Sequence, residues 1–377
     1  GVEHLFEVEI PFATWLADRM DRGVRVDLRL VREMIEARRD AAEGGILRAV
    51  REHAERVPGA GGHGVCRPAG AWSLGGPAGR VLFAEPDLLL LAGPLAMVLV
   101  PSPGNRLVEV EFVAVEAFVA LGLLDLLGGG PKVRRSTKRV VLPSIAELPD
   151  PYAIIAYGAY SRERGWIDPA AMLADAEFPR FRDRAKLAAQ AVLHGLTTAG
   201  LRELLAGEGV PRASAEEVGA LEFVIRRQVF PGIDDLRKDV LPALIFRDGY
   251  VEIDRGVRIL TSYGGRPSGA KFRDMLVSML QGIVALIMRR ATLAAAEALR
   301  PLDAAVVLPR PYSLLIEVPD AEEKAQAAVR ACEEAMRGAF ASSRGGGLPP
   351  VRSRPWGTDS KVWLPQRELL VANDEGE

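Results

Sequence analysis

The feature that most constrains the fold of this chain is a long helical region set between a few strand-forming segments. Residues 107–112 (LVEVEF) alternate in the manner of a strand, in which successive side chains point to opposite faces. Residues 304–308 and 313–318 are predicted to form two more strands around a short tip, PRPY. Because the segments between these strands have mainly helical periodicity, the sequence predicts an α+β fold with one antiparallel sheet and many helices.

The helices are predicted from apolar positions that recur at helical spacing. Residues 9–38 are predicted to form an amphipathic helix, a glycine-containing turn and a second helix that begins near Leu28, with Asp27 as its N-cap. Residues 250–261 suggest two short strands, and residues 58–79, rich in Gly, Pro and Ala, are predicted to be a loop. Further helices are predicted at residues 115–127, 151–162, 169–176, 179–194, 198–206, 214–229, 272–299 and 320–341.

Composition excludes several functional classes. At about 150 residues per domain, the 377 residues suggest two or three folding units. With 48 Lys and Arg against 50 Asp and Glu, the net charge is −2, which argues against a protein that coats nucleic acid but allows a local basic cleft. Two cysteines, Cys66 and Cys332, and four scattered histidines support neither a disulfide framework nor a histidine-rich metal site.

The sequence predicts neither a membrane span nor a signal peptide. The most apolar run, residues 88–100, contains Gly93 and Pro94 and is shorter than the about 20 apolar residues that a spanning helix needs. The expectation is therefore a soluble, cytoplasmic protein with no membrane partner.

A polar stripe marks the helix predicted at residues 179–194. Its members recur every four residues and advance only about 40° around the helix at each step. A cationic stripe can bind the phosphates of a nucleotide through charge-assisted hydrogen bonds. The alternative is an ordinary solvated helix face, which the spacing alone favours. The stripe consists of Arg182, Lys186, Gln190 and His194.

The order of these elements resembles the polymerase core of the family A, bacterial polymerase I-like, DNA polymerases. The first motif of that family reads roughly DYSQIE, where this chain has EFVAVE from Glu111 to Glu116. The second motif, RxxxKxxxFxxxYG, resembles the polar stripe together with Gly195. The third motif, QVHDELVLEVP, is similar to PRPYSLLIEVP from Pro309 to Pro319.

The resemblance covers residues 9–27 and about 104–340, and includes DPYAIIA at residues 150–156. It implies a polymerase-like palm built on the antiparallel sheet, helical fingers and a truncated thumb. The implied domains are residues 1–27 as the opening helix of the palm, 28–103 as a reduced thumb with connecting loops, 104–150 and 250–377 as the palm, and 151–249 as the fingers.

Two departures concern the family's catalytic aspartates, which hold two metal ions for phosphoryl transfer. Glu111 stands at the first aspartate position, and its extra methylene moves the carboxylate by about 1.5 Å in a site that needs near-ideal geometry. Tyr312 stands at the second position and carries no charge at neutral pH. No cofactor is therefore expected, or Mg²⁺ if the protein is active.

Two further features bear on activity. Glu109 lies on the same strand face as Glu111, so the two could form a relocated, weak metal pair, although a strand face at a sheet edge often carries charges for solubility. In residues 28–103, about one long helix and a loop stand where the family has a long helical thumb. A polymerase without a full thumb is expected to bind primer–template weakly.

The resemblance also assigns binding residues. At the nucleotide-binding positions stand Arg182, Lys186, Gln190, His194 and Glu116. For nucleic acid, the candidates are a basic run and two residues of later motifs, namely Lys132, Arg134, Arg135, Lys138, Arg139, Arg266 and Gln281. The alternatives for the basic run are a solvated loop and a patch for an acidic partner.

Together these features favour a family A polymerase-like protein that is catalytically inactive and acts by binding nucleic acid or a replication or repair partner. One alternative is an atypical DNA-directed DNA polymerase that uses Glu109 and Glu111 with magnesium. Another is a structural accessory subunit of a replication complex. The missing second carboxylate and the reduced thumb argue against independent catalysis.

Overall fold

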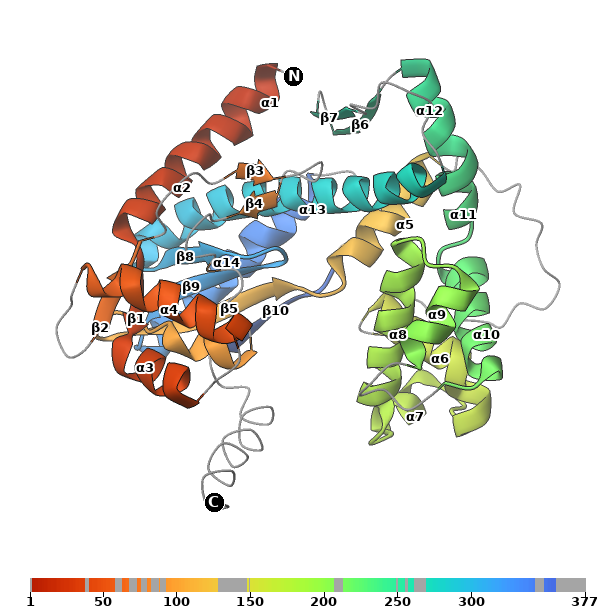
Figure 1. The fold of residues 1–377 in the computed structure, drawn as a ribbon, viewed down its shortest axis with the longest axis horizontal. Coiled ribbons are helices and arrows are strands. Elements are labelled where there is room, and N and C mark those ends of the chain that lie inside the picture. Colours follow the sequence, from red (N-terminus) through yellow and green to blue (C-terminus); the bar gives the residue numbers. More distant parts are fainter. Residues whose placement is uncertain are drawn as a thin grey trace. The chain divides into compact units, whose positions relative to one another are not determined.

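The chain divides into two compact units, whose elements are drawn in Figure 1. The first unit contains Gly1–Phe112, Ala285–Ala339 and Val351–Glu377, and the second contains Val113–Val284 and Phe340–Pro350. The computed structural model describes residues 2–37, 41–57, 63–67, 73–75, 80–82, 88, 93–127, 148, 150–206, 213–248, 250–254, 257–260, 269–342 and 349–356.

The first unit is built on a four-stranded antiparallel sheet in the order β10-β5-β9-β8. β5 (Asn105–Phe112) and the hairpin of β8 (Ala305–Pro309) and β9 (Ser313–Pro319) confirm the strands predicted from the sequence. β10 (Val351–Pro355) is not among the strands predicted above, and it pairs with β5 on the side away from β9. β5 is therefore an interior strand, and the expectation that its glutamates lie at a sheet edge is wrong.

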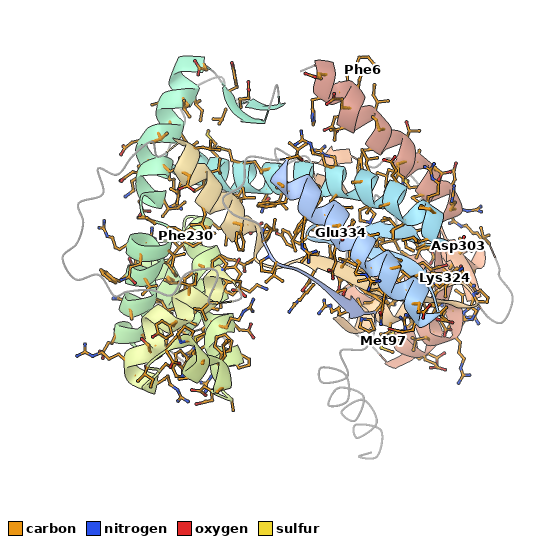
Figure 2. All side chains as sticks on the ribbon, turned by 180° about the vertical axis from the view of Figure 1, so that it is seen from behind. Phe6, Met97, Phe230, Asp303, Lys324 and Glu334 are labelled. Carbon is orange, nitrogen blue, oxygen red and sulfur yellow. The ribbon has the colours of Figure 1, made fainter. Side chains whose placement is uncertain are left out.

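Two long helices accompany the sheet. α14 (Glu322–Ala341), predicted at residues 320–341, crosses one face of the sheet in Figure 2 and buries Cys332. α13 (Gly269–Leu299), predicted at residues 272–299, has residues in both units. Residues 275–302 are long and apolar enough to cross a membrane, but 72% of their most apolar window is buried inside the structure. The core helix of a soluble protein can be equally long and apolar, so this helix is only weak evidence for a membrane span.

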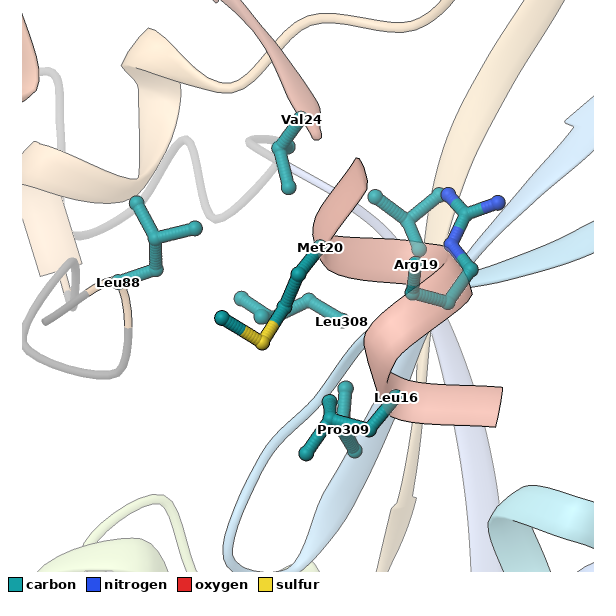
Figure 3. A pocket seen from close by; sticks show the side chains of 8 residues that line it. Leu16, Arg19, Met20, Val24, Leu88, Leu308 and Pro309 are labelled. Carbon is teal, nitrogen blue, oxygen red and sulfur yellow. The ribbon is translucent and has the colours of Figure 1, made fainter. Parts of the chain in front are cut away.

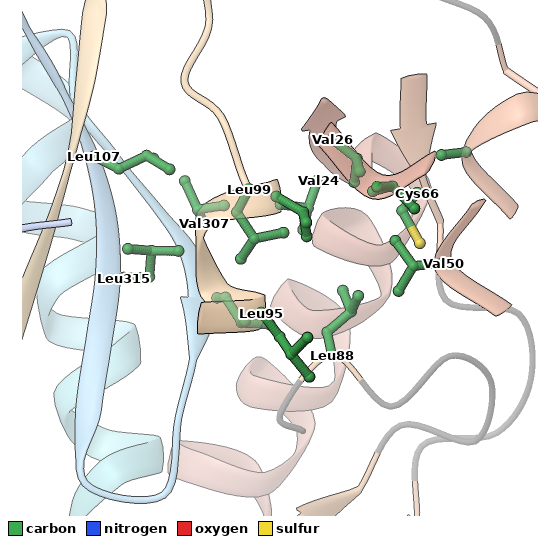
Figure 4. Close-up of a cluster of buried hydrophobic side chains, with 14 of the residues drawn as sticks. Val24, Val26, Val50, Cys66, Leu88, Leu95, Leu99, Leu107, Val307 and Leu315 are labelled. Carbon is green, nitrogen blue, oxygen red and sulfur yellow. The ribbon is translucent and has the colours of Figure 1, made fainter. Parts of the chain in front are cut away.

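The other face of the sheet packs against the N-terminal part of the first unit. Figure 4 shows Leu107 and Leu315 of the sheet facing Leu95 and Leu99. Burying each such side chain contributes about 1.5–3 kcal/mol, which holds these elements to the sheet. The contributing elements are α2 (Ile10–Arg22), β1 (Val24–Asp27), α3 (Leu28–Ala37), α4 (Ala41–Glu55), β2 (His63–Cys66) and the 3-10 helix Gly93–Val98.

The N-cap predicted at Asp27 is confirmed. Its carboxylate oxygen Oδ1 accepts hydrogen bonds from the backbone N–H groups of Arg29 (2.9 Å) and Leu30 (3.0 Å). These bonds satisfy two donors at the start of α3 that have no partner within the helix. Ahead of α2, α1 (Val2–His4) and a π-helical turn (Leu5–Glu9) extend the helical segment beyond the predicted start.

Two expectations for residues 28–103 are wrong. The described part of this segment contains two α-helices, α3 and α4, in place of about one long helix. The predicted loop at residues 58–79 contains β2, which pairs with β1, and β3 (Ser73–Gly75), which pairs with β4 (Arg80–Leu82). Gly64 lets β2 lie close to α4, because a Cβ at this position would clash with the carbonyl oxygen of Ala54.

The second unit is mainly helical, and its predicted helices are confirmed with small shifts at their ends. Asp150, Asp168, Thr197 and Ser214 each cap a helix with a side-chain oxygen. The elements are α5 (Val115–Leu127), α6 (Pro151–Arg164), α7 (Pro169–Ala174), α8 (Phe178–Leu193), α9 (Thr198–Leu205), α10 (Ala215–Phe223) with its π-helical extension (Val224–Val229), α11 (Ile233–Asp235), a π-helical turn (Leu236–Val240), α12 (Leu241–Asp248), β6 (Tyr250–Asp254) and β7 (Val257–Leu260).

Both cysteines are expected to be unreactive in the folded protein. Cys66 and Cys332 are fully buried in the first unit, and burial raises the pKa of each thiol to about 12. Because the thiolate is the reactive form, a disulfide reagent at pH 8 should react with neither cysteine until denaturant is added, and then with both. Rapid labelling of the native protein would contradict the burial of these side chains.

Candidate functional site

A charged cluster lies on the sheet face that carries Leu107. In the register of β5 and β10, Glu109 lies opposite Arg354, and Glu111 lies opposite Arg352. Residues two apart along a strand point to the same face, so the two glutamates form a row beside a row of two arginines. Opposite charges on directly opposed residues of neighbouring strands attract each other.

Glu109 is buried, with 4% of its surface exposed, yet both carboxylate oxygens have partners. Oε2 accepts hydrogen bonds from Nε and Nη2 of Arg354, at 3.0 and 2.7 Å. Oε1 accepts a hydrogen bond from the hydroxyl of Ser313 at 2.7 Å and lies 3.8 Å from Nε of Arg310. These partners offset the cost of burying a charged group.

Glu111 makes a similar but more exposed pair. Its Oε1 accepts a hydrogen bond from Nε of Arg352, and its Oε2 lies 3.8 Å from Nη2 of Arg354. The side chain of Glu111 is 19% exposed, and that of Arg352 is 59% exposed. Three guanidinium groups, those of Arg310, Arg352 and Arg354, therefore surround the two carboxylates, so positive charge is in excess.

The hairpin tip lies where the third-motif resemblance predicts it. No helix occurs at residues 304–318, and Ser313 is the cross-strand partner of Glu111. The backbone N–H of Phe112 donates a hydrogen bond to the carbonyl oxygen of Tyr312 at 3.0 Å. The structure therefore brings Glu109, Glu111 and the tip together in the first unit.

The residues of this cluster do not fit a magnesium ion. Mg²⁺ requires octahedral oxygen ligands at short distances, and Tyr312 contributes a phenol where a second carboxylate would be needed. Glu109 and Glu111 are already bound to guanidinium groups. Within the described part of the chain, no group of three or more His, Cys, Asp or Glu side chains is placed to hold a metal ion.

The arginines of this cluster are not among the site residues predicted from the sequence. Arg352 and Arg354 lie in the segment VRSRP, whose alternation of arginine with other residues is a strand signal. This pattern could have predicted an arginine row on one face of a strand. It could not have shown that the row pairs with Glu109 and Glu111, because the pairing register is not a local property.

The polar stripe of α8 lies in the second unit, where Arg182 is already engaged. Its Nε and Nη2 donate hydrogen bonds to Oδ2 of Asp150 at 2.9 and 2.7 Å. Oδ1 of Asp150 accepts from the backbone N–H groups of Tyr152 and Ala153 as the N-cap of α6. The Arg182 side chain is 22% exposed and that of Asp150 is 2% exposed, so this pair joins α6 to α8.

The other members of the stripe differ in exposure. Lys186 is exposed, whereas Gln190 and His194 are half-buried. Nε2 of His194 lies 3.7 Å from Oε2 of Glu116, which is buried in α5. That distance is too long for a hydrogen bond. The structure thus brings two predicted nucleotide-binding residues, His194 and Glu116, close together.

The predicted nucleic-acid contacts lie mostly outside the described residues. Gln281 is described, and it is half-buried in α13. The residues beyond the described ranges are Lys132, Arg134, Arg135, Lys138, Arg139 and Arg266.

A small pocket elsewhere in the first unit offers little chemistry. Figure 3 shows Leu16, Met20, Leu88 and Leu308 around it, with Arg19 as the charged side chain. Burial lowers the pKa of the Arg19 guanidinium. A ligand site normally combines an apolar lining with several convergent polar groups, which this pocket lacks.

Comparison with known proteins supports the fold. No family model matches the chain, and no curated protein sequence matches it. Among solved structures, the chain is similar to the POL domain of Pol1 from M. smegmatis, in complex with DNA primer–template and dNTP. The TM-score is 0.61 at 17% sequence identity, and the match covers 93% of this chain and 70% of that chain. The predicted α+β fold is therefore confirmed, and it is similar to that of a polymerase domain.

Proposed function

We propose that this protein is a polymerase-like domain that binds nucleic acid and does not join nucleotides. The observation that carries the proposal is the arginine–glutamate cluster on β5 and β10. The two carboxylates available for metal binding, Glu109 and Glu111, have guanidinium groups as partners. Two-metal phosphoryl transfer needs carboxylates that are open to metal ions.

The nucleotide-binding positions support the same conclusion. Arg182 is hydrogen-bonded to Asp150 and would have to break that pair to bind a triphosphate fully. Gln190 and His194 replace the aromatic residues that the family resemblance implies, which weakens stacking on a base and sugar. Lys186 keeps an exposed charge for a phosphate.

Packing of α3 and α4 supports a reduced thumb. Val31 of α3 and Leu47 and Val50 of α4 are fully buried in the same core as the sheet residue Leu107. Helices that pack their apolar face into the body of the protein are not available as an extended arm around a duplex. Weak binding of primer–template is the expected consequence.

If the domain does not join nucleotides, the role left to it is to bind a partner. The similar POL domain was solved with DNA primer–template and dNTP, which favours DNA as the first partner to test. The whole chain carries a net charge of only −2, so attraction to DNA must come from local clusters of arginine and lysine. A replication or repair protein is the partner to seek if DNA does not bind.

The purified protein is expected not to extend a primer with either magnesium or manganese. Without an open pair of carboxylates, the rate should be about a thousandfold or more below that of an active polymerase assayed beside it, because lost transition-state charge stabilisation has effects of this size. A gel-based extension assay measures this, with a binding titration on the same DNA. Extension that Glu111→Ala abolishes would establish the atypical polymerase instead.

A double substitution, Glu111→Asp with Tyr312→Asp, provides a matched test of the cause. It restores the family's residue types at both positions but leaves Arg310, Arg352 and Arg354 in place. We expect no recovery of full activity, because these guanidinium groups would remain the nearest cations to both carboxylates.

A further inference from the structure

In the charged cluster of the first unit, guanidinium groups neutralise two carboxylates, as metal ions do in a metal site. Arg352 and Arg354 lie on one face of β10, beside Glu111 and Glu109 of β5. Arg310 adds a third guanidinium from the hairpin tip. Each guanidinium keeps its charge at every physiological pH, whereas a bound metal ion can dissociate.

We propose that the guanidinium groups of Arg352 and Arg354 replace divalent metal ions at this sheet face, and that they hold phosphate groups of nucleic acid without any metal. The two glutamates then have a structural task, which is to fix the arginines in place. The phosphate-binding part of this inference rests on the function proposed above. The metal-replacing part does not depend on that function.

The exposure of the arginines supports a phosphate contact. The side chains of Arg352 and Arg354 are 59% and 40% exposed, whereas Glu109 is 6% exposed at its side chain. The negative groups therefore lie beneath the positive groups, and a ligand approaching this face meets guanidinium first. Arginine offers five N–H donors in a planar fork that suits a phosphate.

Burial of Glu109 explains why metal ions should be excluded. Its two oxygens already accept hydrogen bonds from Arg354 and Ser313. A metal ion would have to displace the Arg354 guanidinium from the buried Glu109 carboxylate, and the ion would then lie next to a second cation. The arginines thus act as a permanent barrier to metal binding at this face.

The first arm of the test measures binding of a fluorescent primer–template duplex at matched ionic strength, with EDTA or with magnesium. Wild-type binding should be present in EDTA and should be no tighter with magnesium, because the arginines need no metal and Mg²⁺ competes for the same phosphates. The variant Arg352→Ala with Arg354→Ala should bind about tenfold or more weakly, and its log–log salt slope should fall by about 1.8, for two lost phosphate contacts. The matched control is Arg300→Ala with Arg330→Ala, which removes two exposed charges of the same unit and should change neither quantity.

The second arm measures Mn²⁺ binding by the loss of the free-ion EPR signal, and needs no DNA. Wild type should bind no Mn²⁺ at this face, and the arginine double variant should gain a site that Glu111→Gln removes. Wild-type binding that Glu111→Gln abolishes would overturn the inference, and so would a folded double variant that gains no site. If the double variant unfolds, Arg352→Ala alone tests the gain, since Arg352 is the more exposed of the pair.

The two arms separate the two proposals. If wild type binds no DNA in either buffer, nucleic-acid binding is refuted as the function, while the manganese measurement still decides whether arginine replaces metal. If DNA binding is present but needs magnesium, the further inference is wrong and nucleic-acid binding stands. If DNA binding survives the double substitution unchanged, the phosphate contacts lie elsewhere, and the phosphate-binding part of the inference is wrong.

Discussion

Replacing Glu217 with glutamine is expected to cost about 3 to 5 kcal/mol of unfolding free energy, the range for breaking a buried ion pair from one side. Glu217 of α10 is paired with Arg184 of α8, and its Oε1 accepts a hydrogen bond from the hydroxyl of Tyr160 at 2.7 Å. Arg184 is 8% exposed and Tyr160 is 1% exposed. Loss of the carboxylate charge would remove the Glu217 ion pair from the buried Arg184 guanidinium.

Urea denaturation followed by circular dichroism measures this effect. The matched control is Glu216→Gln, one residue earlier on α10, where the side chain is exposed and the expected change is within about 0.5 kcal/mol. A second variant, Tyr160→Phe, should cost about 1 kcal/mol, because it removes one neutral donor and leaves the ion pair intact. If Glu217→Gln and Glu216→Gln behave alike, the network does not stabilise the second unit.

Much of the secondary structure could be predicted because its signals are local. Asp27 is predicted to cap the helix that begins near Leu28, and this cap forms. The helix predicted from residue 151 also forms, with Asp150 as its N-cap. Alternation at residues 107–112 and the two apolar segments around the PRPY tip likewise specify strands within a few residues. Periodicity and capping depend on neighbours three or four positions away, so one sequence is sufficient to read them.

Pairing between distant segments could not be read in the same way. β10 joins β5 through partners such as Glu111 and Arg352, which lie 241 positions apart in the chain. The neighbours of β5 decide whether its glutamates are exposed at an edge or buried inside the sheet. Without that pairing, Glu109 resembles a solubilising edge residue, and in the structure it is the most enclosed carboxylate of the cluster.

The composition of residues 58–79 predicts a loop where the structure has strands. Glycine, proline and alanine favour loops on average. β2 nevertheless forms there, because it pairs with β1 and because Gly64 lets the strand approach α4. Tertiary contact can thus override local preference in a short strand. The same limit applies to the candidate site, where the motif order predicted the position of Tyr312 but not the arginines around the glutamates.

Arg182 is predicted to bind a nucleotide but has a carboxylate as its partner in the structure. The sequence pattern places Arg182 at a nucleotide-binding position, and the structure places its guanidinium against the Asp150 carboxylate. A residue that holds two helices together can still border a ligand, but its charge is then largely neutralised by its partner. Measuring the strength of the pair therefore shows how much of the Arg182 charge a phosphate could use.

The variant Asp150→Ala is expected to lower the unfolding free energy by about 2 to 4 kcal/mol, the combined range for losing a cap and one side of a largely buried ion pair. Asp150 is 1% exposed and serves both as the N-cap of α6 and as the partner of Arg182. Asp168 gives a matched control, since it caps α7 by accepting from Ala171 N–H at 2.7 Å, is exposed and also precedes a proline. Its replacement by alanine should cost about 1 kcal/mol, for the cap alone.

A double-mutant cycle with Arg182→Ala isolates the ion pair from the cap. Arg182→Ala should cost less than Asp150→Ala, because Asp150 keeps its two backbone N–H donors when the arginine is removed. The cycle should give a coupling energy of about 1 to 3 kcal/mol, as for residues that share one hydrogen-bonded network. If Asp150→Ala costs no more than Asp168→Ala and the coupling is near zero, the pair adds nothing to stability. The Arg182 charge would then be available to a nucleotide phosphate, as the family A resemblance implies.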